Sequence, residues 1–531
     1  MHKGIFAYCF ILFFNSLFAQ STIDVLHYKF KIELNDQNDT IKGTARIRFI
    51  LKQLNGPFNF DLTAINGKGK GMIVTNVSLA SSSRISFQQA NDEITITAPS
   101  CKQGDTLDAV IAYKGIPADG LIISKNKYGD RTFFADNWPT RAHNWIPCKD
   151  QPDDKATFEF IVTAPAHYEV ISNGRKTEEK IINPNKKLTH WVEDIPLSTK
   201  IMVIGVARFA VKEYKDSPPG IPISAWVYPQ DSTTGFSNYS VAPAILKFLS
   251  NYIAPYPYNK LANVESKTIY GGMENASCIF YEESSASSPQ GAESLLAHEI
   301  SHQWFGDMAS EKTFAHLWLS EGFATYLTHL YIANKYGIDS MNNEMKVDRQ
   351  QVISFAKRSG HPVVDSISQP KFLLNPNSYQ RGSWVLHMLH RQSGDSVFKQ
   401  IIRSYYEKYK GANANTRDFE LVAENVSGIN LKVFFDQWLY RSSIPQLRID
   451  WHYSDTEKKI TLTLEQLQAS EAFQFPLDIL VNTTAEDSMI HTINITQKKQ
   501  IFNFPLNSKP TSVVADPFTS LLFEGTVKEI K

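Results

Sequence analysis

The sequence predicts an α+β protein of several domains: an antiparallel β domain at residues 20–232, a mostly helical domain at 233–445 and a small C-terminal β-sandwich at 446–531. Two observations carry this prediction. Apolar residues recur with a period of two in the first and last parts of the chain and with a helical period in the middle. The chain has 531 residues, enough for three or four domains of about 100–200 residues each.

The first residues are typical of a secretory signal peptide, which we place at residues 1–19. Lys3 precedes an apolar run from Ile5 to Phe14, and the cleavage position is expected near Ala19. The run is shorter than the roughly 20 apolar residues that a membrane-spanning helix needs, so an N-terminal anchor is the less favoured alternative. We therefore expect an exported protein without stable membrane insertion, located in a periplasm or outside the cell.

The segment from residue 23 to about 230 has the alternation of β-strands. Its first apolar residues alternate with charged ones: Tyr28, Phe30, Ile32 and Leu34. The last strands of the domain are expected at 201–209 and 223–228, before the polar connector PQDSTTG. This pattern places a domain boundary near residue 232.

After the connector the apolar period becomes helical. The first helix keeps its apolar residues on one face until prolines 255 and 257 end it: Ile245, Phe248, Leu249 and Tyr252. Further helices are predicted at 293–305, 317–336, 382–391, 416–425 and 431–440. Short alternating segments return from Gln446 onward, which predicts the small C-terminal β domain.

Charge and cysteine content exclude two classes of protein. The 54 lysines and arginines balance 54 aspartates and glutamates, so the chain has no general positive field for nucleic acid, and no nucleic-acid partner is expected. Signal cleavage would leave Cys101, Cys148 and Cys278. Three widely spaced cysteines do not make a disulfide scaffold, and we assign them no catalytic role.

The strongest local motif is His298-Glu299-Ile300-Ser301-His302. Because positions i and i+4 share one face of a helix, both imidazoles can bind one metal ion while Glu299 projects beside them toward a water molecule. Taken alone, the motif leaves open the alternative of two surface histidines on an amphipathic helix.

A second predicted helix supplies a third candidate ligand, Glu321. It lies in the apolar sequence LWLSEGFA, where an unpaired carboxylate is costly and a nearby cation would explain it. Eighteen residues, 303–320, separate it from His302, which is enough for a loop and the start of a packed helix. Three protein ligands leave a fourth position open, as at catalytic zinc sites. We expect one zinc ion per chain, with Glu299 as general base and Asp307 as a candidate acceptor that orients a ligand histidine.

The segment before this helix contains Gly271-Gly272-Met273-Glu274-Asn275. Paired glycines permit close backbone approach, so an extended peptide could add here as a strand. Glu274 would then face the end of that peptide and could bind a charged α-amino group. On the residues alone, a glycine turn followed by a solvated glutamate is the alternative.

The order GGMEN, HEISH and WLSEGFA resembles the aminopeptidase N family of zinc metallopeptidases. The resemblance implies a thermolysin-like catalytic domain at 233–445. It also implies that Glu274 binds the substrate amine, that Glu299 is the base, and that the zinc ligands are His298, His302 and Glu321.

The same resemblance implies a tyrosine that donates a hydrogen bond to the oxyanion. Tyr379, in the sequence YQRGS, fits the family's tyrosine-x-lysine-glycine pattern, except that Arg381 replaces the lysine. We therefore expect Tyr379 to take this role.

The N-terminal part of the chain also resembles this family, through PCKDQP at 147–152 and KATF at 155–158. Family members commonly place a glutamine or glutamate upstream of the first element, to help bind the amine and shape the first pocket. This chain has Asp136-Asn137-Trp138-Pro139 there, so the role of Asn137 and the preferred N-terminal residue are left open. Many relatives continue into a large helical C-terminal domain, whereas this chain stops after the small β domain, which predicts a more open site.

These observations predict an exported zinc-dependent aminopeptidase that acts on peptides with a free N-terminus. Two alternatives are a non-peptide hydrolase of the epoxide type on the same scaffold and a non-catalytic binding protein. A binding protein would be expected to lose at least one of the base, the ligands, the amine-binding glutamate or the tyrosine.

Overall fold

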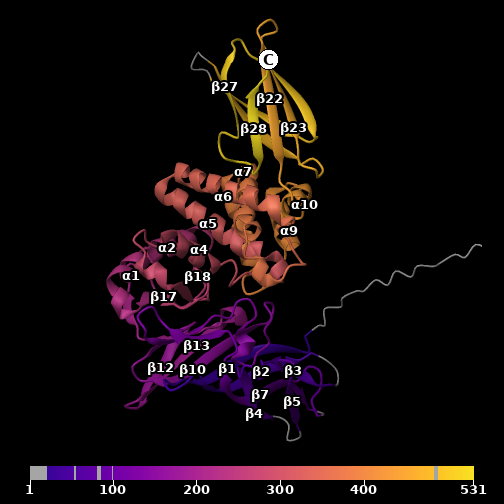
Figure 1. Cartoon of the computed structure of the whole chain (residues 1–531). Helices are drawn as coiled ribbons and strands as arrows, with labels where there is room; N and C mark the ends of the chain where they lie inside the picture. Colours follow the sequence, from indigo (N-terminus) through magenta and orange to yellow (C-terminus); the bar gives the residue numbers. More distant parts are fainter. Residues whose placement is uncertain (1–20, 53–55, 81–84, 99, 484–487, 531) are drawn as a thin grey trace, which may run out of the picture.

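The structure is a computed structural model that describes residues 21–52, 56–80, 85–98, 100–483 and 488–530. The predicted signal peptide at 1–19 lies outside these ranges. Figure 1 shows three parts in chain order: a β domain, a helical domain above it, and a second β domain at the far end. The coarse order of domains predicted from the sequence is therefore confirmed. Among the described residues, no helix has the length and apolarity to cross a membrane.

The N-terminal domain consists of three sheets. The largest has seven strands in the order β12-β13-β10-β1-β2-β7-β4. Its strands are β1 (Ile23–Glu33), β2 (Ile41–Leu51), β4 (Gly71–Leu79), β7 (Thr106–Ile116), β10 (Lys155–Pro165), β12 (Arg175–Asn183) and β13 (Lys186–Ser198). A four-stranded sheet contains β8 (Leu121–Lys125), β9 (Arg131–Ala135), β11 (Glu169–Ser172) and β14 (Ile204–Ala207), and a three-stranded sheet contains β3 (Phe58–Asp61), β5 (Ser86–Ala90) and β6 (Glu93–Thr97).

One pair of strands in this domain corrects the prediction of an antiparallel domain. β1 pairs with β10 in parallel, with Tyr28 opposite Phe158 and Phe30 opposite Phe160, whereas the other pairs of the large sheet are antiparallel. Parallel neighbours need a long connection. The whole segment between β1 and β10 supplies it, so the local alternation of residues could not reveal the direction of pairing.

A five-stranded sheet lies at the start of the helical domain, in the order β15-β16-β17-β19-β18. Its strands are β15 (Ala210–Glu213), β16 (Ile223–Val227), β17 (Leu261–Ser266), β18 (Gly272–Met273) and β19 (Cys278–Glu282). The strand expected at 201–209 is β14, which stays in a sheet of the first domain. The strand expected at 223–228 is β16, which pairs instead with β17, after the connector, and with β15, which was not predicted. Sheet membership therefore favours a boundary near residue 209 over the predicted one near 232. β18 is at one end of the strand order, so the GGMEN segment is at a sheet edge.

The described residues contain ten α-helices. They are α1 (Ser232–Asn238), α2 (Ala242–Tyr252), α3 (Glu283–Ser287), α4 (Glu293–His302), α5 (Trp318–Tyr336), α6 (Ile338–Ser359), α7 (Gly382–Ser393), α8 (Asp395–Tyr409), α9 (Thr416–Ser427) and α10 (Lys432–Leu439). The helices predicted between 293 and 440 are confirmed within a few residues at each end. α1, α3, α6 and α8 were not predicted.

The C-terminal domain contains two sheets. One has the order β26-β23-β22-β28 and the other the order β25-β24-β27. The strands are β22 (Gln446–Ser454), β23 (Lys459–Gln466), β24 (Phe475–Thr483), β25 (Ser488–Ile495), β26 (Lys499–Pro505), β27 (Pro510–Ala515) and β28 (Glu524–Glu529). The predicted β character of this region is confirmed.

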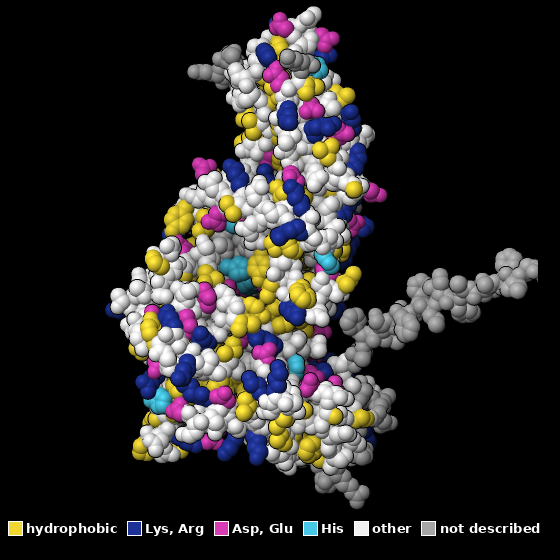
Figure 2. All heavy atoms as spheres, in the orientation of Figure 1, with side chains coloured by type: hydrophobic (Ala, Val, Ile, Leu, Met, Phe, Trp, Pro, Cys, Tyr) yellow, Lys and Arg dark blue, Asp and Glu magenta, His cyan; other side chains and the backbone are white. Residues whose placement is uncertain are grey.

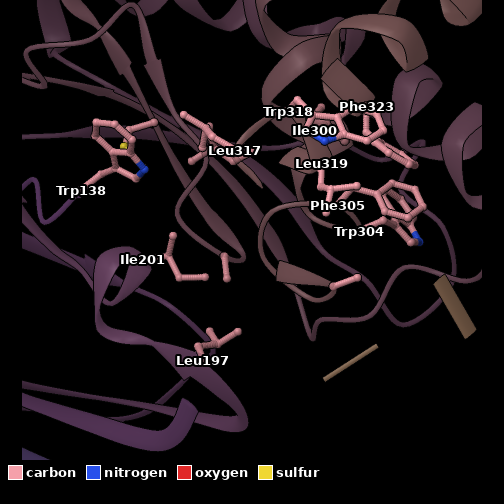
Figure 3. Packing of buried hydrophobic residues seen from close by; sticks show 14 of the residues in the cluster. Trp138, Leu197, Ile201, Ile300, Trp304, Phe305, Leu317, Trp318, Leu319 and Phe323 are labelled. Carbon is pink, nitrogen blue, oxygen red and sulfur yellow. The ribbon is translucent and has the colours of Figure 1, made fainter. Parts of the chain in front are cut away.

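Buried aromatic residues fix α4 against α5. Phe305, just after α4, and Phe323 of α5 have ring centroids 4.7 Å apart. Trp304 and Trp318 are fully buried in the same cluster, and Figure 3 shows these four side chains packed together, with Trp138 of the N-terminal domain lying apart from them. Burial of side chains of this size stabilises the crossing of the two helices by several kcal/mol in total, at roughly 1.5–3 kcal/mol each.

Candidate active site

A cavity of about 490 Å³ lies between the edge strand β18, α4, α5 and the turn before α7. Nine of the ten residues predicted for the site line it: Gly271, Gly272, Met273, Glu274, His298, Glu299, His302, Glu321 and Tyr379. Asn275 does not line it. Its side chain is buried beside the cavity, with Nδ2 3.4 Å from the Met273 carbonyl oxygen. On the face drawn in Figure 2, acidic and basic side chains are interspersed and the helical domain is hollowed, with histidine side chains visible in the hollow.

His298, His302 and Glu321 bring three ligand atoms to one point. Glu321 Oε2 is 3.3 Å from Nε2 of each histidine, and the two Nε2 atoms are 3.1 Å apart. Bonds of about 2.0–2.1 Å in a tetrahedron place ligand atoms about 3.3 Å from one another. Both the donor types and their separations therefore fit a zinc ion.

The orientation of His302 is set by the segment that follows α4. Its Nδ1 lies 3.1 Å from the Phe305 carbonyl oxygen and 3.0 Å from Ser320 Oγ. A ring N–H donated to that carbonyl leaves the Nε2 lone pair free to bind a metal. Gly306 has φ +122°, and a Cβ there would approach Ser320 Oγ to 2.3 Å, so this position requires glycine.

Asp307 does not take the orienting role that we predicted for it. Its Oδ2 accepts a hydrogen bond from Gln303 Nε2 at 2.9 Å, and the Phe305 carbonyl oxygen takes the place beside His302. Gln303 was missed by the sequence analysis. Its Nε2 also donates to the Glu274 carbonyl oxygen at 2.8 Å, and its Oε1 accepts from the Ser277 backbone N–H at 2.7 Å. Gln303 thus fixes the GGMEN segment to the end of α4.

Burial and neighbouring charge control the protonation of the carboxyl groups. Burial raises the pKa of Glu321, but the two histidines outweigh burial and hold that pKa well below its usual range. Burial lowers the pKa of His302, but Glu321 raises it to about 10 overall, so a metal ion that binds Nε2 displaces a proton from this ring. Burial raises the pKa of Glu299 well above its usual value and also raises that of Glu274. Glu321 is therefore an anion suited to a cation, while Glu299 takes up a proton readily.

The second glycine of the GGMEN segment makes room for Glu299. A Cβ added to Gly272 would lie 2.2 Å from Glu299 Oε1, whereas a Cβ on Gly271 would meet no atom within 4 Å. Only Gly272 is therefore required by packing. The close contact holds the Glu299 carboxyl group against the edge strand where a substrate could bind.

Tyr379 reaches the cavity from a π-helical turn at Asn377–Arg381, directly before α7. Its ring stacks on His298, with centroids 5.8 Å apart and an interplanar angle of 18°. Burial, followed by the nearby Glu321, raises the pKa of Tyr379 well above its usual value, so the hydroxyl keeps its proton. This turn can approach α5 because Gly322 and Gly382 meet there: a Cβ on Gly322 would lie 2.9 Å from Gly382 Cα.

Arg381 anchors the turn that carries Tyr379. The side chain is fully buried and donates hydrogen bonds to four backbone carbonyls. The acceptors are the carbonyl oxygens of Trp438, Arg441, Ser442 and Ser443, at 2.7–3.2 Å. The arginine that departs from the family pattern therefore ties Tyr379 to the end of α10 and to the linker into the C-terminal domain.

Six residues that line the cavity were not predicted: Trp138, Tyr270, Leu295, Thr325, Leu374 and Gln380. Asn137, whose role was left open, points elsewhere. Its Nδ2 donates to the carbonyl oxygens of Thr199 and Met202, and its Oδ1 accepts from Trp145 Nε1. The departure from the family pattern at residues 136–139 indicated that this segment lies near the site. Trp138 lines the cavity there, whereas Asn137 does not.

Comparison with known proteins gives the following matches. The model described as "Peptidase M1 N-terminal domain" matches residues 25–201, and "Peptidase family M1 domain" matches residues 238–438. Glutamyl aminopeptidase of Mus musculus is 28% identical over 349 residues, which are 62% of this chain and 36% of that protein. Aminopeptidase A of Gloydius brevicauda is 27% identical over 414 residues, 74% of this chain and 42% of its own length. Aminopeptidase M1-C of Oryza sativa subsp. japonica is 30% identical over 338 residues, 60% of this chain and 38% of its own. The match spans less than half the length of each relative.

Proposed function

Because the chain belongs to peptidase family M1, we propose that it is a zinc-dependent aminopeptidase that removes the N-terminal residue from peptides. One observation carries the proposal: Glu274 lines the same cavity as the His298-His302-Glu321 cluster and Glu299. A carboxylate that can bind an α-amino group thus lies beside groups that can hydrolyse the adjacent peptide bond. The aminopeptidase relatives support the same reaction class.

We propose that His298 Nε2, His302 Nε2 and Glu321 hold one zinc ion per chain. When bound, zinc lowers the pKa of a water molecule and polarises the carbonyl of the scissile bond. The hydrogen bond from His302 Nδ1 to the Phe305 carbonyl oxygen keeps its other nitrogen available as a ligand. The low pKa of Glu321 keeps this ligand ionised at neutral pH.

Each remaining side chain has one task. Glu274 binds the substrate's α-ammonium group, which places the first peptide bond beside the cluster. Glu299 takes a proton from the attacking water and gives it to the leaving nitrogen as the C–N bond breaks, and its raised pKa suits both transfers. The Tyr379 hydroxyl donates a hydrogen bond to the carbonyl oxygen as negative charge develops on it.

The anchor at Glu274 explains why one residue is removed at a time. The α-amino group and the first peptide bond of a substrate are separated by a single residue, so binding the amine leaves only that bond near Glu299. The signal-like start of the chain supports export to a periplasm or to the outside of the cell, where peptides with free N-termini would be the substrates.

Substitution Glu299→Gln tests the chemistry separately from metal binding. The amide keeps the size of the side chain but cannot accept the proton, so we expect kcat to fall by at least about 1,000-fold. Metal analysis should still find one zinc per chain, because Glu299 is not a proposed ligand. Full activity in this variant would refute the role of Glu299, and loss of zinc in it would refute the ligand assignment.

A further inference from the structure

We propose that the cavity selects substrates whose N-terminal side chain is large and uncharged, aromatic or aliphatic, and that it rejects acidic ones, with Trp138 as the main specificity-determining residue. This inference rests on the proposed aminopeptidase function. It adds the class of substrate, which the sequence left open.

The position of the substrate's first side chain follows from its two anchors. The α-amino group would lie at Glu274 and the scissile carbonyl at the His298-His302-Glu321 cluster, so the Cα atom lies between them. The side chain must then extend toward the walls that neither anchor occupies. Trp138, Tyr270 and Met273 line the cavity. Met273 directly precedes Glu274, and the Trp138 ring contacts that of Tyr270, four residues before Glu274, so we place these three side chains on the wall beside Glu274.

The aromatic part of this wall comes from two domains. Trp138 belongs to the N-terminal domain and is 2% exposed, and Tyr270 directly precedes the GGMEN segment. Their rings meet edge to face, with centroids 5.7 Å apart at 90°, and Trp138 contacts Phe314 in the same manner, also at 5.7 Å. Such a surface favours apolar and aromatic side chains.

Trp138 is held firmly in this place. Asp136 accepts hydrogen bonds from Thr268 Oγ1 and from the Ile269 backbone N–H, each at 3.0 Å. Arg141 Nε donates to the Trp138 carbonyl oxygen at 2.8 Å. The strand end that carries Trp138 is thus fixed to the loop that carries Tyr270, so the wall is formed before substrate binds.

The charges around the cavity disfavour an acidic side chain. The described residues that line it include three glutamates, Glu274, Glu299 and Glu321, and neither a lysine nor an arginine. The cations just outside are already paired: Arg141 with Asp119 and Asp136, and Lys200 with Glu311. Glu321 is assigned to the metal and Glu274 to the substrate's ammonium group, so a glutamyl side chain against the Trp138 wall would be desolvated with no lysine or arginine among the described lining residues to pair with it.

This expectation separates the chain from several of its relatives. Proteins named glutamyl aminopeptidase are 26–28% identical to it, but a residue that pairs with a substrate carboxylate is not found among the described lining residues. Sequence similarity over the shared domains is therefore not enough to assign a preference for N-terminal glutamate to this chain.

The first experiment measures kcat/KM for phenylalanyl, leucyl, alanyl, lysyl and glutamyl arylamides with the zinc-loaded enzyme. We expect the phenylalanyl and leucyl substrates to be fastest and the glutamyl substrate to be at least about 100-fold slower than the leucyl one. A glutamyl rate within tenfold of the leucyl rate would overturn the inference while leaving the proposed function intact. Failure to cleave any of the five would instead overturn the proposed function.

The second experiment places a cation in the wall. Trp138→Lys is compared with Trp138→Met, which removes the same aromatic surface without adding charge. We expect the glutamyl-to-leucyl ratio of kcat/KM to be at least about tenfold higher in the lysine variant than in the methionine variant. Equal ratios in two folded variants would refute the role of Trp138. If either fails to fold by circular dichroism, Tyr270→Lys against Tyr270→Met, at a partly exposed position of the same wall, decides the question by the same criterion.

Discussion

The two β domains flank the helical domain in Figure 1, but they are joined to it in different ways. The N-terminal domain places Trp138 in the lining of the candidate active-site cavity and buries Lys200 against Glu311 of the helical domain. The described lining of the cavity ends at Gln380, so it contains no residue of the C-terminal domain. The C-terminal part of the chain instead contacts α6, α7 and α10, and α6 and α7 precede and follow in sequence the turn that carries Tyr379. The N-terminal domain therefore supplies part of the cavity wall that we propose selects the substrate, and the contacts of Arg381 with the residues before the C-terminal domain hold the turn that carries Tyr379.

Removing the ion pair between the N-terminal and helical domains, Lys200 with Glu311, should have the largest effect on stability. Lys200 and Glu311 are 2.5 Å apart, with side chains 2% and 0% exposed. Lys200→Met leaves the carboxylate buried without a partner, so we expect the free energy of unfolding to fall by about 3–5 kcal/mol in denaturant titrations.

The matched control for this pair is the double variant Lys200→Met/Glu311→Leu. It removes both charges, so it should recover much of the lost stability. Equal stability of the single and double variants would show that the pair is not what holds the junction.

Removing the hydrogen bonds of Arg381 to the end of α10 and to the linker into the C-terminal domain should lower stability less, but it should also lower kcat. Arg381→Met leaves four carbonyls without their donor, one on the buried Trp438 and three on half-buried residues, which should cost about 2–4 kcal/mol. Because the turn would shift Tyr379, we expect kcat to fall about tenfold with KM nearly unchanged.

Arg381→Lys is the conservative variant for the same site and keeps a buried cation with donors. Steady-state kinetics should show partial recovery of kcat. A change confined to KM, or no recovery with lysine, would contradict a role for Arg381 in positioning Tyr379.

The last effect, which should be absent at neutral pH and appear only in acid, is a pH dependence at the junction with the C-terminal domain. Burial lowers the pKa of His387 from 6.5 to about 3, and its Nε2 lies 2.8 Å from the Thr519 carbonyl oxygen of the C-terminal domain. The charged or titratable groups around it are Tyr326 on α5 and, more distantly, His390, Arg391 and His329. The unfolded chain binds a proton at His387 between pH 6.5 and about 3 and the folded chain does not, so stability should fall as pH falls through this window.

His387→Gln keeps an N–H donor without a titrating ring. Unfolding titrations at several pH values between 3 and 6.5 should show a shallower pH dependence for this variant than for the wild-type chain. An unchanged slope would contradict the assignment to His387.

The part of the site built from local spacing was predictable from the sequence, and the part built by long-range contact was not. His298 and His302 are one helical turn apart, and Glu321 lies in an apolar helix, so their types and spacing carried the prediction. Trp138 and Gln303 act through contacts with residues more than 25 positions away, and neither lies in a pattern that indicates the contact.

The same distinction applies to the fold. α6 has few buried residues, and they include polar Asp348 and flexible Met341 and Met345, so its apolar period is weak. Strand periodicity in β1 indicated which face is buried, but it holds no information on whether a strand far along the chain would pair in parallel.

The proposal that Glu274 recognises a free α-amino group is tested most directly by one comparison of rates. We predict that the purified chain hydrolyses leucyl-arylamide at least about 1,000-fold faster than N-acetyl-leucyl-arylamide, because acetylation removes the charge that Glu274 binds. Cleavage of the two substrates within tenfold of one another would contradict it.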